Sequence, residues 1–242
     1  MRTDVVDLRD FYATSLGQAA RRVVRARLRD IWPDVRGMTV VGLGYATPFL
    51  GPFRAEAARA IAAMPASQGV LHWPHEGPGL TALIDEIELP FPDLSIDRLV
   101  LVHYLETAEQ VRPLMREAWR VLTGEGRLMV VAPNRRGLWA RFEHTPFGHG
   151  RPYSPGQLSR LLRECMFTPT RTDAALYLPP VSWRVAPAAA PAWERLRAWG
   201  LSAFAGVVMV EASKQVYAAQ PLLKARRGAV PAAAQPARRV ST

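Results

Sequence analysis

Residues 96–132 of the chain have the sequence IDRLVLVHYLETAEQVRPLMREAWRVLTGEGRLMVVA, and this stretch decides the fold. Ile96–His103 is an almost continuous apolar run, which is typical of a strand buried on both faces. A helix is predicted over Thr107–Leu122, where apolar residues recur at helical spacing, and a second apolar strand follows at Arg127–Ala132. Strand, helix and strand joined by short links form a βαβ unit, which predicts neighbouring parallel strands with a right-handed crossover.

A second stretch, MTVVGLGYATPFLGPF at residues 38–53, joins an apolar strand to a glycine-bearing turn and then to a helix. Gly42 and Gly44 leave the backbone free to adopt positive φ and let a ligand approach the main chain. A helix is expected to begin near Pro52 and to run over Arg54–Met64, with its unpaired amide groups aimed at a nucleotide-like ligand. Such turns also serve only to pack a strand against a helix, and that alternative stays open.

The other predicted elements extend this pattern on both sides. Leu16–Trp32 is expected to form an amphipathic helix with a basic outer face. Gly69–Trp73 is the candidate for a short second strand, and Leu80–Ile87 is either a strand or a single helical turn. Beyond the βαβ unit the expected elements are a helix over Pro155–Cys165, a strand at Ala174–Leu178, a helix around Ala192–Ala205 and a final strand at Gly206–Tyr217.

The bulk properties fit one α/β domain in a chain of 242 residues, of which 49% are hydrophobic and 21% charged. No stretch reaches the roughly 18 apolar residues that a membrane span requires. The first twelve residues mix acids and bases, so they do not resemble a signal peptide, and we expect a cytoplasmic protein. The single cysteine, Cys165, excludes an internal disulfide and fits a reducing compartment.

A net charge of +10 raises the hypothesis of an anionic partner. Nucleic acid is one such partner, through Arg21, Arg22 and Arg25 of the basic helix and through residues 220–242. That tail carries five basic residues, no acids and no periodicity, which predicts disorder. The arginines are spread through the chain without an RNA-binding motif, so a general bias of composition towards arginine and alanine is the competing explanation.

Two segments carry a resemblance to a known family. LPFPDLSIDRLVLVHYLE at 89–106 and REAWRVLTGEGRLMVVAPN at 116–134 resemble the class I S-adenosylmethionine-dependent methyltransferases, in particular the small-molecule, methyltransferase type 11-like branch. GVVMVEASKQ at 206–215 resembles the last strand of that family, which is antiparallel. The resemblance implies a three-layer α/β fold with a doubly wound, mostly parallel sheet of the Rossmann-like methyltransferase type and an antiparallel last strand. It divides the chain into an N-terminal helical segment over the site at 1–36, a methyltransferase-like domain at 37–219, and the tail.

The resemblance also implies a site for S-adenosylmethionine at the carboxyl ends of the central strands. The residues expected to bind this cofactor are Gly42, Gly44, Tyr45 and Ala46 at the glycine turn, His72 and Trp73 at the end of the second strand, Asp85 and Glu86 near the adenine, and His103 after the fourth strand.

For the chemistry, His103 is the candidate general base and Tyr12 a candidate lid over the pocket. The expected substrate residues are Tyr104 and Glu106 at the pocket edge and His149, Arg151 and Tyr153 in the loop FGHGRPYSP. A histidine after a buried strand also caps turns, and the loop is equally explained as an ordinary turn, so both alternatives stay open. The acceptor is expected to be a small molecule, and the sequence does not identify it or the oligomeric state.

Three departures from the family pattern support a different hypothesis. Val40 replaces the acid before the glycine turn, and Ala46 replaces a third glycine. No carboxylate follows the predicted second strand, where Glu76 is the nearest substitute, and the short span before the fourth strand indicates a missing helix. The alternative function is therefore a catalytically impaired methyltransferase-fold protein that binds or regulates a partner. An NAD-dependent reductase is a weaker rival, because the acid expected some 20 residues after the turn is absent.

We expect no metal site. His72 with His75, and His144 with His149, are the closest pairs of potential ligands, but neither pair has a third ligand at a suitable spacing.

Overall fold

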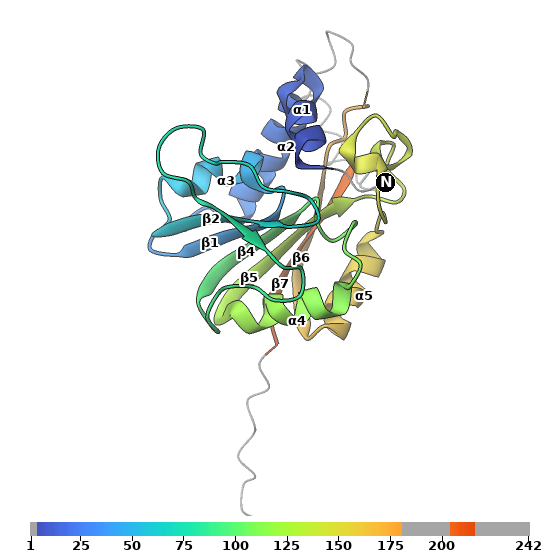
Figure 1. The fold of residues 1–242 in the computed structure, drawn as a ribbon. Coiled ribbons are helices and arrows are strands. Elements are labelled where there is room, and N and C mark those ends of the chain that lie inside the picture. Colours follow the sequence, from blue (N-terminus) through green and yellow to red (C-terminus); the bar gives the residue numbers. More distant parts are fainter. Residues whose placement is uncertain (1–3, 181–203, 216–242) are drawn as a thin grey trace, which may run out of the picture.

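The computed structural model describes residues 4–180 and 204–215, and these form a seven-stranded sheet in the order β3-β2-β1-β4-β5-β7-β6 (Figure 1). The neighbouring pairs from β3 to β5 are parallel, whereas β7 is antiparallel to both β5 and β6. The predicted mostly parallel sheet with an antiparallel last strand is confirmed. The strands are β1 Thr39–Gly44, β2 Arg59–Pro65, β3 Thr81–Ile84, β4 Ile96–Val102, β5 Leu122–Pro133, β6 Phe167–Ala175 and β7 Val207–Lys214.

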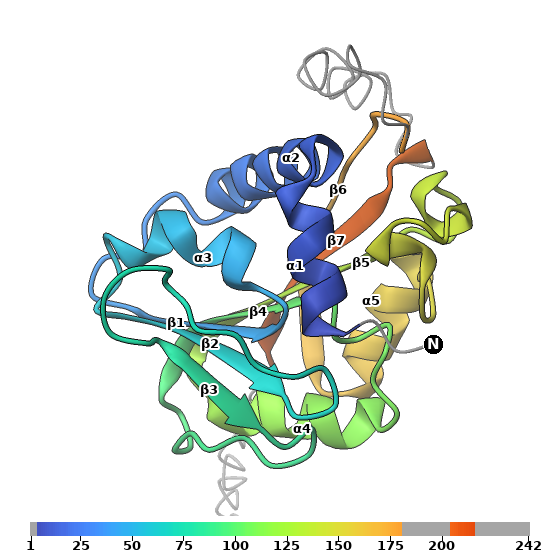
Figure 2. The same cartoon turned by 45° about the horizontal axis from the view of Figure 1, so that its top comes forward.

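Helices cover both faces of this sheet, which makes three layers (Figures 1 and 2). Helices α1, α2 and α3 lie on one face and share a buried apolar cluster with β1 and β2, while α4 and α5 pack into a second cluster on the opposite face. The helices are α1 Val5–Ala13, α2 Ser15–Ile31, α3 Thr47–Arg54, α4 Val111–Val121 and α5 Pro155–Glu164, with short 3-10 turns at Trp139–Arg141 and Pro146–Gly148.

The N-terminal segment forms two helices that cross closely. Thr14 separates them, and its hydroxyl caps α2 by accepting the Gly17 N–H at 3.0 Å. A Cβ at Gly17 would lie 2.0 Å from the carbonyl oxygen of Phe11, so only glycine allows the helices to approach this closely. The predicted amphipathic helix at Leu16–Trp32 is confirmed as α2, and the crossing brings α1 over the carboxyl ends of the strands (Figure 2).

The βαβ unit is confirmed as β4, α4 and β5. Val100 and Leu101 of β4 are completely buried, as the continuous apolar run predicted. The helix begins at Val111 rather than at Thr107, so Pro113 falls in its first turn, where proline removes no helical hydrogen bond.

Two predictions between β1 and β3 were wrong. The segment predicted as a helix at Arg54–Met64 contains the end of α3 and the strand β2, which pairs with β1 from Thr39↔Arg59 onwards. Gly69–Trp73, the predicted second strand, lies in the loop after β2. Alanine is a strong helix former, so RAIAAM looks helical in isolation, but pairing with β1 and burial of its side chains override that propensity.

The remaining predictions are mixed. Leu80–Ile87 contains a strand, β3, and no helix occurs at 66–80 or 85–95, as the short span indicated. Only the first two residues of the predicted strand Ala174–Leu178 belong to a strand, because β6 ends at Ala175. This strand begins earlier than predicted, and its sequence FTPTRTDAA is largely polar. The helix around Ala192–Ala205 lies almost wholly outside the described residues, and residues 220–242 lie entirely outside them.

None of the helices in the described parts of the chain is both long enough and apolar enough to cross a membrane.

Candidate active site

Gly42 and Gly44 lie in the last three residues of β1, and packing within the protein requires glycine at both positions. Gly44 has φ +79°, and a Cβ there would lie 2.5 Å from the carbonyl oxygen of Val102 on β4. A Cβ at Gly42 would lie 2.4 Å from Cβ of Ala46, at the start of α3. The positive φ predicted for this turn therefore occurs at Gly44, while the space beside both Cα atoms is already filled by protein atoms.

Tyr12 of α1 covers the carboxyl ends of β1 and β4. Its side chain is only 4% exposed, and its ring stacks on that of Tyr45 from the glycine turn, with centroids 5.8 Å apart. Its hydroxyl oxygen lies 2.7 Å from Nε2 of His103. The structure thus brings together Tyr12, Tyr45 and His103, which the sequence analysis had placed in one site.

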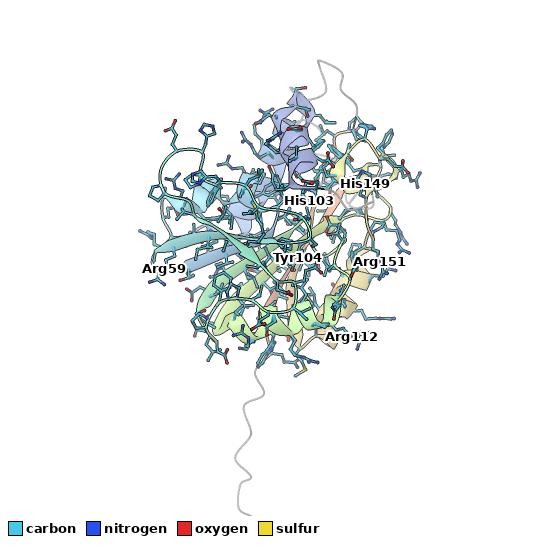
Figure 3. The ribbon with its side chains drawn as sticks, viewed as in Figure 1. Arg59, His103, Tyr104, Arg112, His149 and Arg151 are labelled. Carbon is cyan, nitrogen blue, oxygen red and sulfur yellow. The ribbon has the colours of Figure 1, made fainter. Side chains whose placement is uncertain are left out.

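His103 follows β4 directly, with φ +51°, and lies just below α1 (Figure 3). Its ring is buried and contacts Phe147, whose centroid is 4.8 Å away. Its carbonyl oxygen accepts a hydrogen bond from the side-chain amide of Gln68. The sequence does not indicate Phe147 or Gln68 as site residues, because apolar and amide side chains in loops give no signal of a site until the loops are folded together.

Glu106 provides a carboxylate to this cluster. It is 4% exposed, and its Oε1 lies 3.3 Å from Nδ1 of His103. Within the described part of the chain neither oxygen of this carboxylate has a hydrogen-bond partner. Burial, together with Tyr45 and the nearby Glu106 charge, raises the pKa of Tyr12, so this hydroxyl keeps its proton. With Nδ1 of His103 protonated towards Glu106, Nε2 can accept the proton of Tyr12.

The loop FGHGRPYSP is held against Glu106 through its backbone. The Arg151 N–H donates to the carbonyl oxygen of Glu106 at 2.8 Å, and Gly150, with φ +76°, leaves no room for a Cβ beside that oxygen. Arg151 is exposed, whereas His149 and Tyr153 are half-buried. Figure 3 shows where His149 and Arg151 lie. The loop therefore borders the cluster, and roles for these three side chains in substrate binding stay predictions.

An acidic cavity of about 320 Å³ opens beside this cluster, at the carboxyl ends of β2 and β3. The hydroxyl of Ser67 donates to the carboxylate of Glu86 there, which brings an acid from β3 to the end of β2. The buried hydroxyl of Tyr104 has no hydrogen-bond partner within the described ranges, and burial, aided by the charges of Glu86 and Asp85, raises its pKa. The lining residues are Ala66, Ser67, Ile84, Asp85, Glu86, Ile87, Glu109 and Gln110.

The placement of His72 and Trp73 at the end of the second strand was wrong, because β2 ends at Pro65. Trp73 lines a different cavity, of about 410 Å³, between α1, α2 and α3. His72 lies in the same loop and is exposed, with Nε2 3.2 Å from the carbonyl oxygen of Gly77.

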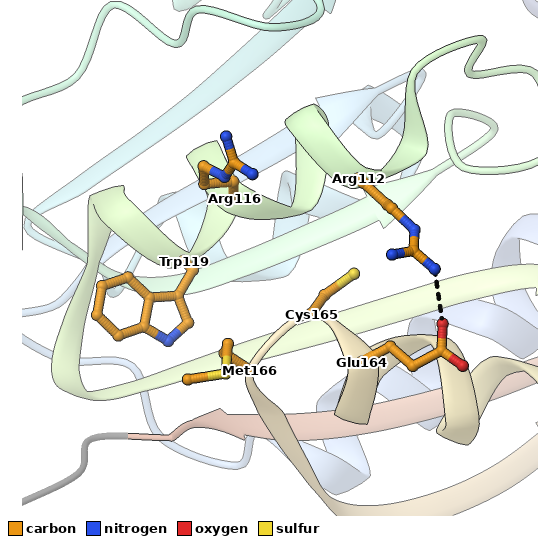
Figure 4. A pocket seen from close by; sticks show the side chains of 6 residues that line it. All are labelled: Arg112, Arg116, Trp119, Glu164, Cys165 and Met166. Carbon is orange, nitrogen blue, oxygen red and sulfur yellow. Dashed lines mark hydrogen bonds and ion pairs between the residues drawn. The ribbon is translucent and has the colours of Figure 1, made fainter.

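A third cavity, of about 350 Å³, lies between α4 and the end of α5 (Figure 4). These two helices cover the face of the sheet opposite α1 (Figure 1). Trp119, Cys165 and Met166 give it an apolar lining, and Arg112 pairs with Glu164 across its rim at 3.1 Å. None of the predicted site residues lines it. Among the residues that the structure describes, no three histidine, cysteine or acidic side chains are grouped as metal ligands would be.

Comparison with known protein families gives one match. Residues 39–130, from β1 to the middle of β5, match the methyltransferase domain family. Over this range the chain is similar to a methyltransferase domain. The matched range contains the glycine turn, the acidic cavity, His103 and Glu106. No curated protein sequence matches the chain significantly.

Several solved structures that are similar to the chain are described as S-adenosylmethionine-dependent methyltransferases. A protein of this class from Thermotoga maritima is 15% identical, with a TM-score of 0.57 over 87% of this chain and 96% of its own. One from Archaeoglobus fulgidus is 20% identical, with a TM-score of 0.55 over 80% and 94%. Geranyl diphosphate methyltransferase in complex with S-adenosylmethionine is 12% identical, with a TM-score of 0.52 over 78% and 84%. At these identities the likeness establishes the fold, which is that of the class I methyltransferases.

The residues of the methyltransferase domain fit the adenosine half of S-adenosylmethionine. The adenine amino group and the ribose hydroxyls are hydrogen-bond donors, and the acidic cavity offers the carboxylates of Asp85 and Glu86 as acceptors. Tyr104 adds a buried hydroxyl without a partner near both acids. Because Ser67 holds Glu86 at the end of β2, an acid reaches the position where the sequence showed no carboxylate.

Proposed function

We propose that the domain transfers the methyl group of S-adenosylmethionine to a small-molecule acceptor, in the cytoplasm. The observation that carries this proposal is the buried series of contacts from Tyr12 to His103 to Glu106, next to the acidic cavity. A methyltransferase-like domain with an acidic cavity that can accept hydrogen bonds from adenosine, and with a buried histidine that can take up a proton, has the parts that the reaction requires.

Asp85, Glu86 and Ser67 are the proposed adenosine ligands. Each carboxylate can accept a hydrogen bond from a ligand hydroxyl or amino group, and Ser67 already orients Glu86. The cofactor, when bound, supplies an electrophilic methyl group on a sulfonium, so the chain needs mainly to align the acceptor, exclude water and remove a proton.

His103 is the proposed proton acceptor, and Tyr12 the group through which it acts. An acceptor that loses its proton passes it to Oη of Tyr12, while Tyr12 passes its own proton to Nε2 of His103, 2.7 Å away. The proton thus ends on Nε2, and the Glu106 carboxylate, 3.3 Å from Nδ1, stabilises the imidazolium that forms. Phe147 and α1 keep bulk water from this transfer.

Calorimetric titration with S-adenosylhomocysteine tests the cofactor site. We expect binding with a Kd on the order of 1–100 μM, weakened about tenfold by Asp85→Asn or Glu86→Gln, since each removes a charged acceptor. Glu88→Gln is the control, because Glu88 is exposed in the same segment and does not line the acidic cavity. Absence of heat at about 1 mM ligand would contradict the proposal.

A methyl-transfer assay with a panel of small acceptors separates the two hypotheses from the sequence. Release of S-adenosylhomocysteine above the acceptor-free rate supports the enzyme. Binding of cofactor without release for any acceptor favours the catalytically impaired alternative, for which Val40 at the position of the usual acid is the motivating feature.

A further inference from the structure

The 410 Å³ cavity between α1, α2 and α3 is lined in part by Tyr12, a residue of the proposed proton path. Tyr12 forms part of its wall, and the hydroxyl of the same side chain contacts His103. No residue lines both this cavity and the acidic cavity. The described residues that line it are Arg9, Tyr12, Ala13, Gln18, Arg21, Arg25, Tyr45, Thr47, Pro48, Gly51, Trp73 and His75. We call it the arginine cavity.

Two arginines of the arginine cavity, Arg21 and Arg25, have no acidic partner among the described residues. Arg9 pairs with the neighbouring Asp10, but no carboxylate among the described residues pairs with Arg21 or Arg25. Nε of Arg21 is buried and has no hydrogen-bond partner in the described structure. Burial, with the adjacent charge of Arg21, lowers the pKa of Arg25. Two guanidinium groups without acids, one of them partly desolvated, would be stabilised by an anion between them.

The guanidinium group of Arg25, a residue of α2, packs against α3. A Cβ at Gly51 would lie 2.9 Å from an Nη atom of Arg25, so the guanidinium packs directly against the backbone of α3. A bulkier residue at 51 would move the charged group without removing it. Tyr12, Tyr45 and Trp73 supply aromatic surface in the same cavity, which suits a planar or apolar ligand group.

We infer that the arginine cavity binds the methyl acceptor, and that this acceptor is a small molecule with a phosphate or carboxylate next to an aromatic or apolar part. The assignment to the acceptor rests on the proposed function, because it uses Tyr12 as the group that receives the acceptor's proton. The anion contacts Arg21 and Arg25, and the aromatic part lies against Tyr12 and Tyr45 beside His103.

Titration of the full chain with phenyl phosphate, with phenol as the uncharged probe, tests the cavity by calorimetry. We expect phenyl phosphate to bind at least about tenfold more tightly than phenol, and the Arg21→Gln/Arg25→Gln double variant to lose about tenfold in that affinity. Arg22→Gln is the matched control, because Arg22 is exposed on the same helix and does not line the cavity. An equal loss in Arg22→Gln, or no binding of phenyl phosphate, overturns the inference.

Gly51→Ala tests the geometry with the charge retained. The added methyl group displaces the Arg25 guanidinium, so we expect weaker binding of phenyl phosphate with unchanged far-ultraviolet circular dichroism. Wild-type affinity in this variant would overturn the placement of the anion beside Arg25.

A second titration separates the acceptor from the cofactor as the source of the anion. S-adenosylhomocysteine carries a carboxylate, whereas 5′-methylthioadenosine does not. Wild-type affinity of the double variant for both supports an acceptor site. A selective loss for S-adenosylhomocysteine assigns the arginines to the cofactor carboxylate and overturns the inference. A third result separates the two proposals. If neither S-adenosylhomocysteine nor 5′-methylthioadenosine binds, but the double variant still loses affinity for phenyl phosphate, the proposed function is wrong and the anion site is supported.

Discussion

The hydroxyl oxygen of Tyr12 lies 2.7 Å from Nε2 of His103, although 91 positions separate the two residues in the chain. The contact joins α1 to the carboxyl end of β4, where Glu106 meets the other ring nitrogen at 3.3 Å. Tyr12 and His103 are each 4% exposed, so the pair is shielded from solvent. A proton can pass between a hydroxyl group and a histidine nitrogen that are in direct contact and shielded from water, as Tyr12 and His103 are.

Tyr12→Phe should separate chemistry from binding. The change leaves Nε2 of His103 buried without its partner, which should cost about 1–3 kcal/mol of unfolding free energy. Methyl transfer should fall about 100-fold, the lower end of what a positioned acid or base contributes. Urea denaturation and initial rates measure the two effects. Asp10→Asn, on the exposed side of α1, should change neither, and a fully active Tyr12→Phe protein would contradict the proposed proton path.

Glu106→Gln should lower the rate of transfer without changing affinity for S-adenosylhomocysteine. The amide keeps the shape of the side chain but cannot stabilise a positive charge on His103. We expect a rate loss of about tenfold or more, read as a fall in kcat at constant KM for the cofactor. A parallel rise in the Kd for S-adenosylhomocysteine would instead place Glu106 in the cofactor site.

Gly42→Ala should destabilise the fold without any contact to a ligand. Its Cβ would lie 2.4 Å from that of Ala46 and 3.0 Å from a methyl carbon of Leu50, so α3 must move away from β1. Overpacking of this kind costs about 1–3 kcal/mol. Gly156→Ala is the control, because a Cβ there meets nothing within 4 Å and alanine favours the helix α5. Equal stability of the two variants in urea would contradict the packing role of Gly42.

Arg120→Met should destabilise the protein in a pH-dependent way. Arg120 donates to the carbonyl oxygen of Leu89 and to the Glu117 carboxylate, and so connects the segment Leu89–Phe91 to α4. Hydrogen bonds from Arg120, together with one from the Leu89 N–H, lower the pKa of Glu117. A depressed carboxyl pKa stabilises the fold above the unfolded value of about 4.3, and this stabilisation is lost as the pH falls through the folded pKa.

The measurement is the free energy of unfolding of wild type and Arg120→Met between about pH 7 and pH 3. We expect a difference of about 1–3 kcal/mol near neutrality that shrinks on acidification. Arg112→Met is the control, because the side chains of Arg112 and Glu164 are 74% and 46% exposed and such a pair contributes little. A difference independent of pH would show that the backbone contacts of Arg120, rather than its charge pair, stabilise the segment.

Cys165 should react slowly with thiol reagents. Burial raises the pKa of its thiol, so less thiolate is present near pH 8 than for free cysteine. The rate of reaction with 5,5′-dithiobis(2-nitrobenzoate), compared with free cysteine from about pH 7 to pH 10, tests this, and the protein's profile should be shifted to higher pH. A rate equal to that of free cysteine at pH 8 would contradict the burial of Cys165 in the cavity of Figure 4.

The sequence by itself determined the α/β fold. The hydrophobic pattern alone predicts the βαβ unit correctly. It indicates a strand at Ile96–His103, an amphipathic helix after it and a strand at Arg127–Ala132, and the structure contains all three. The resemblance also predicted Tyr45, His103 and Glu106 at neighbouring strand ends, with Tyr12 of the N-terminal segment as a lid over them. Local propensity failed at Arg59–Pro65, where alanines that favour a helix form β2 because a neighbouring strand is there to pair with them.

Only the tertiary structure decided how these parts meet. The sequence contains no signal that Ser67 would hold Glu86 at the end of β2, that Gln68 would bind the carbonyl of His103, or that Phe147 would pack on its ring. The sequence predicts Arg21 and Arg25 on an exposed basic face of the helix. In the structure α2 packs against α3, and both arginines line a cavity that Tyr12 also lines. These relationships join residues far apart in the chain, and their energies exist only once loops and helices are packed together, so no local pattern can encode them.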